Sequence, residues 1–313
     1  ITDYDTLPSF NNQNFTIVEG DNLIIEDKNN ILNNYQDDNN LEREANKLII
    51  RDLKEGEYDF KLVRDDKNFN TPIIFYQANN SQNLVKTGYL DKKQINFKVK
   101  VIQTNINITK IDKDTKSITA SGEAKLDGAE YTLYDENLKE LEKVTIENNI
   151  ANISNLNFGK YYLKETKAGL GYTLDNNLYE INITIEEPNI ELILENKVIE
   201  KEIIISKKFG EENNWQDEAN ASFDIYNNNH ELIKELITDE HGTIKITLPY
   251  GEYKIIQKDS YPGYYKVEPI IIKVTDEETE FIDLKDLKIP VPNTHNESLF
   301  AKLLRIIFLI LIC

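Results

Sequence analysis

Apolar and polar side chains alternate with a period of two along most of this chain. Clear examples are YEINITI (179–185), TIKITL (243–248) and IIIKV (270–274), which alternate or are rich in β-branched residues. A β-strand points successive side chains to opposite faces, so this pattern predicts strands. Turn-forming residues such as DEHG (239–242) separate the runs. Many short strands with regular turn signals are typical of β-sandwiches, and the predicted fold class is all-β.

Helical periodicity is weak throughout. The segment NNLEREANKLII (39–50) has a start compatible with a helix, but its apolar stripe of Leu41, Ala45 and Leu48 is thin. A short turn fits these residues equally well.

One element occurs three times. A Leu is followed, after a short gap, by Gly-x-Tyr in LKEGEYDFKL (53–62), LNFGKYYLKE (156–165) and LPYGEYKIIQ (248–257). Copies two and three agree further: AEYTLYD (129–135) aligns with ASFDIYN (221–227), and a Gly-Tyr pair follows each copy at equal distance. The repeat predicts two related sandwiches.

We therefore expect four segments. They are a β-rich N-terminal domain that shares only the Gly-x-Tyr element, two related β-sandwiches, and a tail: 1–103, 104–199, 200–290 and 291–313. Because the chain begins at Ile1, it is either a mature protein or a fragment, and the first domain could be incomplete.

Composition and charge narrow the class of partner. Hydrophobic residues make up 40% of the 313 residues, enough for several small cores. The net charge of −19 argues against nucleic acid or an anionic membrane as a partner. A solvated surface explains the acidity. The alternative, a calcium site at DEETE (276–280), lacks the ligand spacing of an EF-hand loop, and we expect no metal and no cofactor. The single Cys excludes disulfides within the chain.

Three polar residues of the second domain fall on apolar strand faces. Lys110 ends the strand 106–110, Glu165 points inward from 157–166, and Asn196 ends the last strand. Unpaired buried polar groups cost roughly 1–3 kcal/mol each, and burial favours the neutral forms of amine and acid. A neutral Lys is a nucleophile and a protonated Glu can carry protons. If Lys110, Glu165 and Asn196 lie together in the core, their chemistry predicts a Lys–Asn amide formed with loss of ammonia. The alternative is that the lysine and the asparagine are ordinary strand-end residues that face solvent.

The third domain has Lys207, Gln257 and Asp286 in the corresponding positions. A carboxamide cannot carry a proton as a carboxyl does, although it can orient a partner by hydrogen bonding. A second cross-link, a buried ion pair and ordinary surface positions all stay open here. The first domain has Leu62 in the acid position, so no such bond is expected there.

The segments TKIDKDTKSITASGEAKLDGAEYTLYD, LNFGKYYLKETKAGLGYTL and LENK resemble the Cna-B/SpaA-like domains of Gram-positive surface adhesins and pilins. The resemblance covers 104–199 well and 200–290 with departures. It implies sandwiches of transthyretin-like or inverse immunoglobulin-like topology, with Lys110 and Asn196 cross-linked and Glu165 as the assisting acid. It also permits a Lys–Asp amide, so Asp286 is compatible with a bond.

In the tail, VPNTH (291–295) resembles an LPXTG-type sorting signal, with Val for Leu and His for Gly. The resemblance implies cleavage after Thr294 by a sortase, which would join the chain to peptidoglycan or a pilin neighbour. The uncharged run 306–313 is only eight residues, whereas a membrane-spanning helix needs about 20. The chain is either cut short or carries a degenerate signal; a plain short hydrophobic helix is the alternative.

These observations favour a secreted, wall-attached stalk or adhesin subunit whose chemistry is a single self-cross-linking event. The alternative is a ligand-binding module in which 1–103 recognises host matrix or glycan, with 72–90 as the candidate surface; an ordinary strand-loop-strand explains 72–90 equally. A secreted hydrolase is a third class. It finds little support, because the three His residues are scattered and no H-E-x-x-H, nucleophile elbow or phosphate loop is present.

Overall fold

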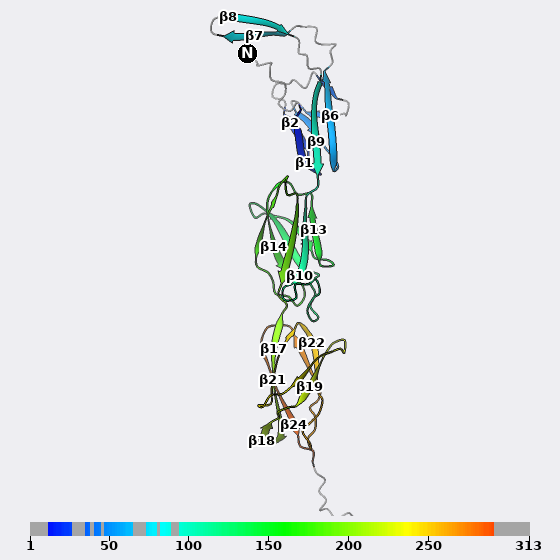
Figure 1. Cartoon of the computed structure of the whole chain (residues 1–313), viewed down its shortest axis with the longest axis vertical. Helices are drawn as coiled ribbons and strands as arrows, with labels where there is room; N and C mark the ends of the chain where they lie inside the picture. Colours follow the sequence, from blue (N-terminus) through cyan, green and yellow to red (C-terminus); the bar gives the residue numbers. More distant parts are fainter. Residues whose placement is uncertain are drawn as a thin grey trace, which may run out of the picture.

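The computed structural model describes residues 12–26, 35–37, 41–44, 47–64, 73–79, 82–88 and 94–290. Every regular element in this part of the chain is a β-strand, which confirms the predicted all-β class. Figure 1 shows three β-modules following one another along the long axis of the molecule. The tail 291–313, with its predicted sorting signal and hydrophobic segment, lies outside the described residues.

The first module has two sheets and a separate hairpin. One sheet has the order β1-β9-β6-β3, the second has the order β2-β5-β4, and β7 pairs with β8 and with no other described strand. The strands are β1 (Asn14–Val18), β2 (Leu23–Glu26), β3 (Tyr35–Asp37), β4 (Glu42–Glu44), β5 (Lys47–Ile50), β6 (Gly56–Arg64), β7 (Ile73–Asn79), β8 (Gln82–Gly88) and β9 (Gln94–Ile102).

The described residues of the segment 39–50 form no helix, so the thin helical stripe did not determine their conformation. The segment contains β4 and β5, which pair antiparallel, and β5 also pairs with β2. Leu48, Ile49 and Ile50 are all buried. Packing against neighbouring strands determines the conformation here, because a helix would bury only the few apolar residues of its narrow stripe.

The second module is a sandwich of two sheets, β13-β10-β16 and β12-β11-β14-β15. Its first and last strands, β10 and β16, pair in parallel. The strands are β10 (Asn105–Asp112), β11 (Glu130–Asp135), β12 (Glu140–Thr145), β13 (Ile150–Ser154), β14 (Gly159–Lys167), β15 (Leu178–Ile183) and β16 (Asn189–Asn196).

The third module repeats this arrangement with one addition. One sheet contains β18-β17-β21 with β24 parallel to β17, and the other has the order β20-β19-β22-β23. Strand β18, which forms a hairpin with β17, has no counterpart in the second module. The strands are β17 (Glu200–Glu211), β18 (Asn214–Asp217), β19 (Ser222–Asn227), β20 (Leu232–Ile237), β21 (Thr243–Pro249), β22 (Gly251–Gln257), β23 (Ile270–Val274) and β24 (Glu280–Leu287).

The Gly-x-Tyr repeat has the same local structure in all three modules. In each copy the Tyr hydroxyl donates a hydrogen bond to the backbone carbonyl four residues earlier, a tyrosine corner. The three pairs are Tyr58 to Lys54 (3.0 Å), Tyr161 to Asn157 (2.8 Å) and Tyr253 to Pro249 (2.9 Å). The repeat therefore specifies the local structure at the start of a strand. It does not fix topology, because β6 pairs with β9 whereas β14 and β22 lie in the sheet opposite the first and last strands.

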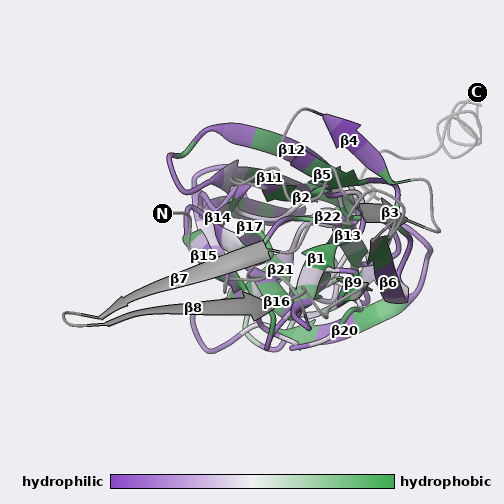
Figure 2. Ribbon diagram, turned by 90° about the horizontal axis from the view of Figure 1, so that it is seen from above, coloured by the Kyte–Doolittle hydropathy of each residue, from purple (hydrophilic) through white to green (hydrophobic). Residues whose placement is uncertain are grey.

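The cores fill the space between the two sheets of each module. In the second module the buried set includes Ile106, Ile108, Tyr131, Leu133, Leu163, Ile181 and Leu194; in the third it includes Ile203, Ile205, Phe223, Ile225, Ile255, Ile272 and Leu284. The edge strands β4 and β12 are polar, and Figure 2 shows both mostly in hydrophilic purple.

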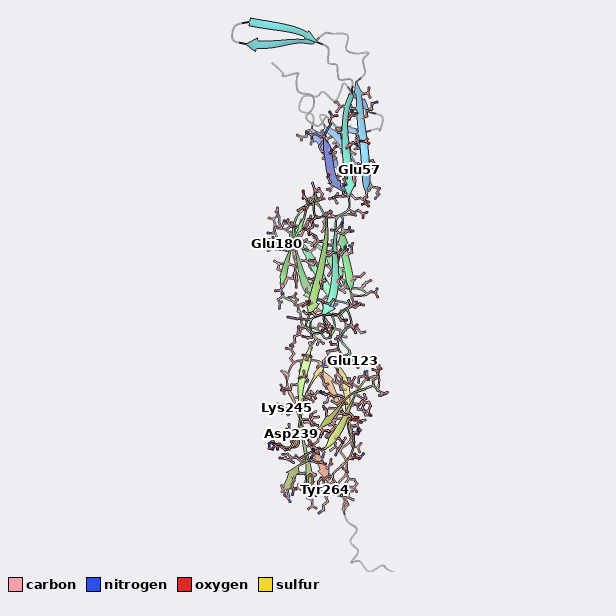
Figure 3. All side chains as sticks on the ribbon, in the orientation of Figure 1. Glu57, Glu123, Glu180, Asp239, Lys245 and Tyr264 are labelled. Atoms are coloured by element: carbon pink, nitrogen blue, oxygen red, sulfur yellow. The ribbon has the colours of Figure 1, made fainter. Side chains whose placement is uncertain are left out.

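The aromatic residue Tyr250 lies at the joint between the second module and the third. Tyr250, in the turn before β22, packs against the end of the second module. Its neighbours there form a small apolar cluster of Ala120, Ala124, Leu126, Ala168, Tyr172 and Val198. The Tyr250 N–H donates to the Ile199 carbonyl, and the Glu123 N–H donates to the Tyr250 carbonyl, both at 2.8 Å. Figure 3 shows Glu123 at this junction.

Gly171 makes this close approach possible. Its φ is +78°, and a Cβ placed on it would lie 2.5 Å from the Tyr250 ring. We expect Gly171→Ala to loosen the joint and widen the distribution of angles between the two modules, measured by small-angle X-ray scattering of the full chain. Gly263→Ala is the matched control, because Gly263 has a φ of +88° but no atom within 4 Å of its Cβ position. Both substitutions cost about 1–2 kcal/mol of backbone strain. Equal scattering from the two variants would contradict the steric role of Gly171.

Candidate functional site

The parallel pairing of β10 with β16 brings Lys110 and Asn196 together. Lys110 pairs with Leu194 and Asp112 pairs with Asn196, so Lys110 lies two residues short of the asparagine's level. Two residues of strand span about 6.6 Å, a distance that an extended lysine side chain covers. Lys110 is fully buried, on the same face as Ile106 and Ile108, as the alternation predicts.

Glu165 reaches the same point from the opposite sheet. It is the third buried residue in the alternation of β14, after Tyr161 and Leu163. Glu165 Oε1 lies 3.0 Å from Lys110 Nζ, and the Asn196 Nδ2 donates to Oε1 and Oε2 at 2.9 and 2.8 Å. Lys110 Nζ also donates to Asn196 Oδ1. Amine, carboxyl and carboxamide thus touch one another inside the sandwich.

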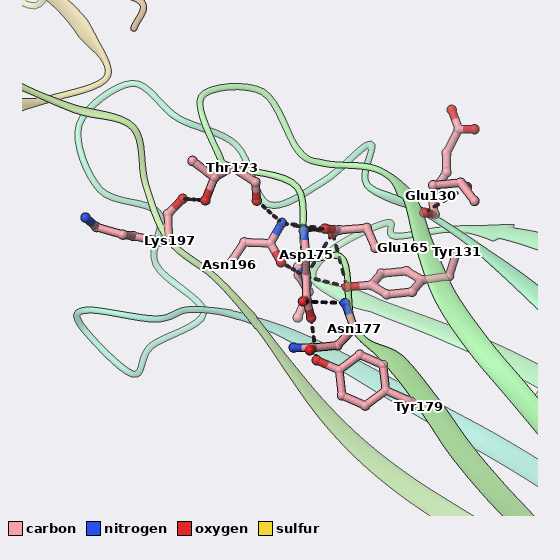
Figure 4. Close-up of polar contacts among 11 residues, drawn as sticks. Glu130, Tyr131, Glu165, Thr173, Asp175, Asn177, Tyr179, Asn196 and Lys197 are labelled. Atoms are coloured by element: carbon pink, nitrogen blue, oxygen red, sulfur yellow. Dashed lines mark hydrogen bonds and ion pairs between the residues drawn. The ribbon is translucent and has the colours of Figure 1, made fainter. Parts of the chain in front are cut away.

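Further groups hold the glutamate and the asparagine in place (Figure 4). The Tyr131 hydroxyl contacts Lys110 Nζ and donates to Glu165 Oε1 at 3.1 Å. The Asp175 N–H donates to Glu165 Oε2 at 2.6 Å, and the Thr173 carbonyl accepts from Asn196 Nδ2 at 2.9 Å. The amide nitrogen is therefore fixed on the side of the glutamate, with the carbonyl oxygen on the side of the lysine.

Sequence reasoning missed these supporting residues. The signal for Tyr131 was present, since the aligned copies AEYTLYD and ASFDIYN have Tyr131 and Phe223 at the same position. The hydroxyl is found only in the module that has the acid Glu165. The carbonyl of Thr173 and the N–H of Asp175 belong to the backbone and leave no mark in the sequence.

Burial controls the protonation of the site. Desolvation lowers the pKa of the Lys110 amine below its ordinary value, although the carboxylate of Glu165 opposes this shift. Desolvation and Glu165 together raise the pKa of Tyr131, so its hydroxyl stays a donor. Burial and the bond to Asp175 raise the pKa of Tyr179 to about 12. The environment thus favours a neutral, nucleophilic amine.

A surface pocket lies beside the site and is lined by Thr173, Asp175, Tyr179 and Asn196, among others. Asn196 itself is only 2% exposed.

The third module also brings its three predicted residues together. Lys207 Nζ lies 2.8 Å from Asp286 Oδ1, and Gln257 Nε2 donates to Asp286 Oδ2 at 2.8 Å. All three are buried, so the surface alternative is wrong. A residue that sequence reasoning missed, Glu218, lies 2.7 Å from Lys207 Nζ.

The remaining predicted positions are placed as follows. Leu62 is fully buried in the apolar core of the first module. The acidic run 276–280 contacts Lys201 through Asp276 at 3.1 Å. In the part of the chain that the structure describes, no group of three or more His, Cys, Asp or Glu residues could hold a metal ion, and no helix is long and apolar enough to cross a membrane. Thr294 lies outside the described residues.

Comparison with known proteins identifies the family. Residues 104–198 and 203–288 each match the SpaA family of prealbumin-like fold domains. The two matches together span more than half of the chain, and the chain therefore belongs to this family.

One curated protein and two solved structures are similar to parts of this chain. A collagen adhesin of Staphylococcus aureus is 38% identical over 76 residues, which are 24% of this chain and only 6% of that protein. The chain thus spans a small part of this relative's length. The structure of the Bacillus anthracis TIE protein resembles it with a TM-score of 0.53 at 22% identity, over 89% of this chain and 51% of that one. A C-terminal fragment of the pilus adhesin SpaC from Lactobacillus rhamnosus GG aligns at 14% identity and a TM-score of 0.45, over 61% of this chain and 99% of the fragment.

Proposed function

We propose that this chain is a structural segment of a Gram-positive surface pilin or adhesin, and that its second module cross-links itself through a Lys110–Asn196 amide. The observation that carries the proposal is the buried contact of Lys110, Glu165 and Asn196. Membership of the SpaA family and the similarity to an adhesin support the surface role.

The geometry gives each residue a part in the reaction. Neutral Lys110 Nζ attacks Asn196 Cγ, forming the Nζ–Cγ bond. Glu165 lies within 3.0 Å of both nitrogen atoms, so it can take a proton from Nζ and deliver it to Nδ2. The Cγ–Nδ2 bond then breaks and ammonia leaves. Amine plus carboxamide gives a secondary amide plus ammonia, Glu165 is regenerated, and the reaction runs once per molecule.

The position of the bond suits a stalk. Lys110 and Asn196 are 86 residues apart and lie on the first and last strands of the module, which pair in parallel. Tension applied to the two ends of the module enters through β10 and leaves through β16. A covalent link between these strands would carry the load past the intervening sheets, so the module would resist unfolding by force.

Intact mass of the full chain tests this proposal. The wild-type chain should be lighter than its sequence by one ammonia for this bond, and Glu165→Ala should restore that mass. Glu180→Ala is the control, because Glu180 is an exposed residue of the neighbouring strand β15. Peptide mapping should locate the loss to a peptide that joins Lys110 to Asn196. A wild-type chain with separate, unmodified Lys110 and Asn196 peptides would overturn the proposal.

The same proposal includes the location of the chain and its attachment to the cell surface. The chain would be secreted and fixed at the cell wall, with a sortase acting after Thr294 and with peptidoglycan or a pilin neighbour as the acceptor. Recognition of host matrix or glycan by 1–103 stays an alternative prediction; within it, β7 and β8 form a hairpin that pairs with no other described strand.

A further inference from the structure

The Lys110 amine is surrounded by three hydrogen-bond acceptors. Its Nζ donates to Glu165 Oε1 at 3.0 Å and also contacts Asn196 Oδ1 and the Tyr131 hydroxyl. The lysine and its three partners are buried, with at most 2% of any of these residues exposed. An ammonium has three N–H donors and no acceptor, so these three oxygens satisfy it completely. This arrangement fits the charged amine, which is the unreactive form of the nucleophile.

The proposed reaction needs a neutral amine in one particular orientation. When the ammonium has passed one proton to Glu165, the amine keeps two N–H groups and gains one lone pair. These three occupy the staggered positions about the Cε–Nζ bond, so they face Tyr131, Glu165 and Asn196 in some order. Attack on Asn196 Cγ requires the lone pair to face the carboxamide. The two N–H groups must then face Glu165 and Tyr131.

The Tyr131 hydroxyl is oriented to accept one of these N–H groups (Figure 4). It donates its own proton to Glu165 Oε1 at 3.1 Å, which leaves its oxygen as an acceptor for Lys110 Nζ. Desolvation and the charge of Glu165 raise the pKa of Tyr131, so the hydroxyl keeps that proton. The Tyr131 ring lies in the apolar core, with its centroid 5.0 Å from Nζ. An amine lone pair turned toward this oxygen would be repelled.

The third module has no hydroxyl at this position. Phe223 occupies the place of Tyr131 on the equivalent strand. The buried amine of Lys207 donates instead to the backbone carbonyl of Lys208 at 3.0 Å, in addition to its two carboxylate partners. A buried lysine on this strand thus has a third acceptor in both modules, and only in the second module does that acceptor come from a side chain of the opposite sheet.

We propose that Tyr131 is a further catalytic residue of the second module, whose hydroxyl accepts one N–H of the neutral amine and so directs the Lys110 lone pair at Asn196 Cγ. The inference rests on the proposed cross-linking reaction and leaves its balance unchanged. Amine and carboxamide give a secondary amide and ammonia. The proton that Lys110 first passes to Glu165 leaves with the ammonia as ammonium. Tyr131 neither gains nor loses a proton overall.

Without the hydroxyl, the amine prefers an orientation that cannot react. In Tyr131→Phe only Glu165 and Asn196 offer acceptors, so both N–H groups face them and the lone pair faces the apolar ring. Turning the lone pair toward Asn196 Cγ then leaves one buried N–H without a partner. The link should therefore form about 10- to 100-fold more slowly, which is the rate equivalent of one unmade buried hydrogen bond.

A time course of intact mass tests this role. The full chain is synthesised in a cell-free system, and the loss of one ammonia is followed with time. Tyr131→Phe should accumulate as an unlinked chain that links slowly, with the loss mapped to the Lys110 and Asn196 peptides. Tyr134→Phe is the matched control, because Tyr134 is half-buried on the other face of the same strand, β11. It should link at the wild-type rate.

Two side chains of nearly equal shape separate hydrogen bonding from packing. With p-aminophenylalanine in place of Tyr131, the ring can accept from Lys110 Nζ and donate to Glu165. With p-methylphenylalanine, the ring fills the same space and can do neither. The first chain should link at least about fivefold faster than the second, a difference that a purely structural role of the ring would not produce. This comparison also decides the question if Tyr131→Phe fails to fold.

The outcomes separate this inference from the reaction on which it rests. A wild-type chain whose Lys110 and Asn196 peptides stay separate would overturn both. A wild-type chain that links, together with Tyr131→Phe linking at the same rate, would overturn only the role of Tyr131. Equal rates for the two substituted rings would likewise reduce Tyr131 to a packing residue and leave the cross-link standing.

Discussion

A chain with Lys110→Met is expected to unfold its second module with about 4–5 kcal/mol less free energy than the cross-linked wild type. The proposed amide closes a loop whose ends are 86 residues apart, and a cross-link over such a loop removes about 4.6 kcal/mol of chain entropy from the unfolded state. Methionine fills most of the volume of the lysine arm, so the loss reports the bond more than a cavity. For a module of this size the midpoint temperature should fall by about 20 °C or more.

Pulse proteolysis of the full chain in urea measures this effect, because peptides from 105–196 report the second module separately from its neighbours. Lys143→Met is the control. Lys143 is an exposed residue of β12 whose ion pair with Glu140 is open to solvent, and such pairs contribute about 0–1 kcal/mol. Equal resistance of Lys110→Met and wild type would show that no cross-link constrains the unfolded chain.

Strand alternation was sufficient to predict the burial of Lys110 and Glu165, and the reason is geometric. A period of two leaves no ambiguity about the face once the neighbouring apolar residues are known. Asn196 was located because it ends the last strand, and parallel pairing brought it to Lys110. The all-β class and two of the three modules followed from the same alternation and from the repeat.

The remaining site residues could not be predicted, because their positions depend on contacts between the two sheets and on the β17–β18 hairpin. The sequence assigned no role to Tyr131, because only the packing of β11 against β10 shows that its hydroxyl contacts Lys110 Nζ. Glu218 follows the β17–β18 hairpin, which has no counterpart in the second module, so aligning the two copies could not suggest it. The sequence indicated that Gln257 can orient a partner by hydrogen bonding, but only the structure shows that its Nε2 donates to Asp286 Oδ2.

The Glu165→Gln chain should show a stability that rises with pH. Without the acid no amide forms, and Lys110 stays a buried free amine whose pKa is lowered chiefly by desolvation. Loss of the Glu165 charge removes the main opposing influence and lowers the pKa of Lys110 further. The unfolded chain then binds more protons than the folded one between the folded-state pKa and the ordinary value of 10.5, so unfolding free energy increases with pH there, by up to about 1.4 kcal/mol per unit.

Pulse proteolysis between pH 7 and about 9.5 checks this slope, with the range ending where ordinary tyrosines begin to ionise. Tyr131, Tyr172 and Tyr179 have raised pKa values and would act in the opposite direction at higher pH. The double variant Lys110→Met/Glu165→Gln is the matched control, because it has the same cavity lining without the amine, and its slope should be flat by comparison. The cross-linked wild type should also be flat, since an amide nitrogen does not titrate. A flat profile in Glu165→Gln alone would mean that Lys110 is charged or solvated in the folded module, and the nucleophile assigned to it would not exist.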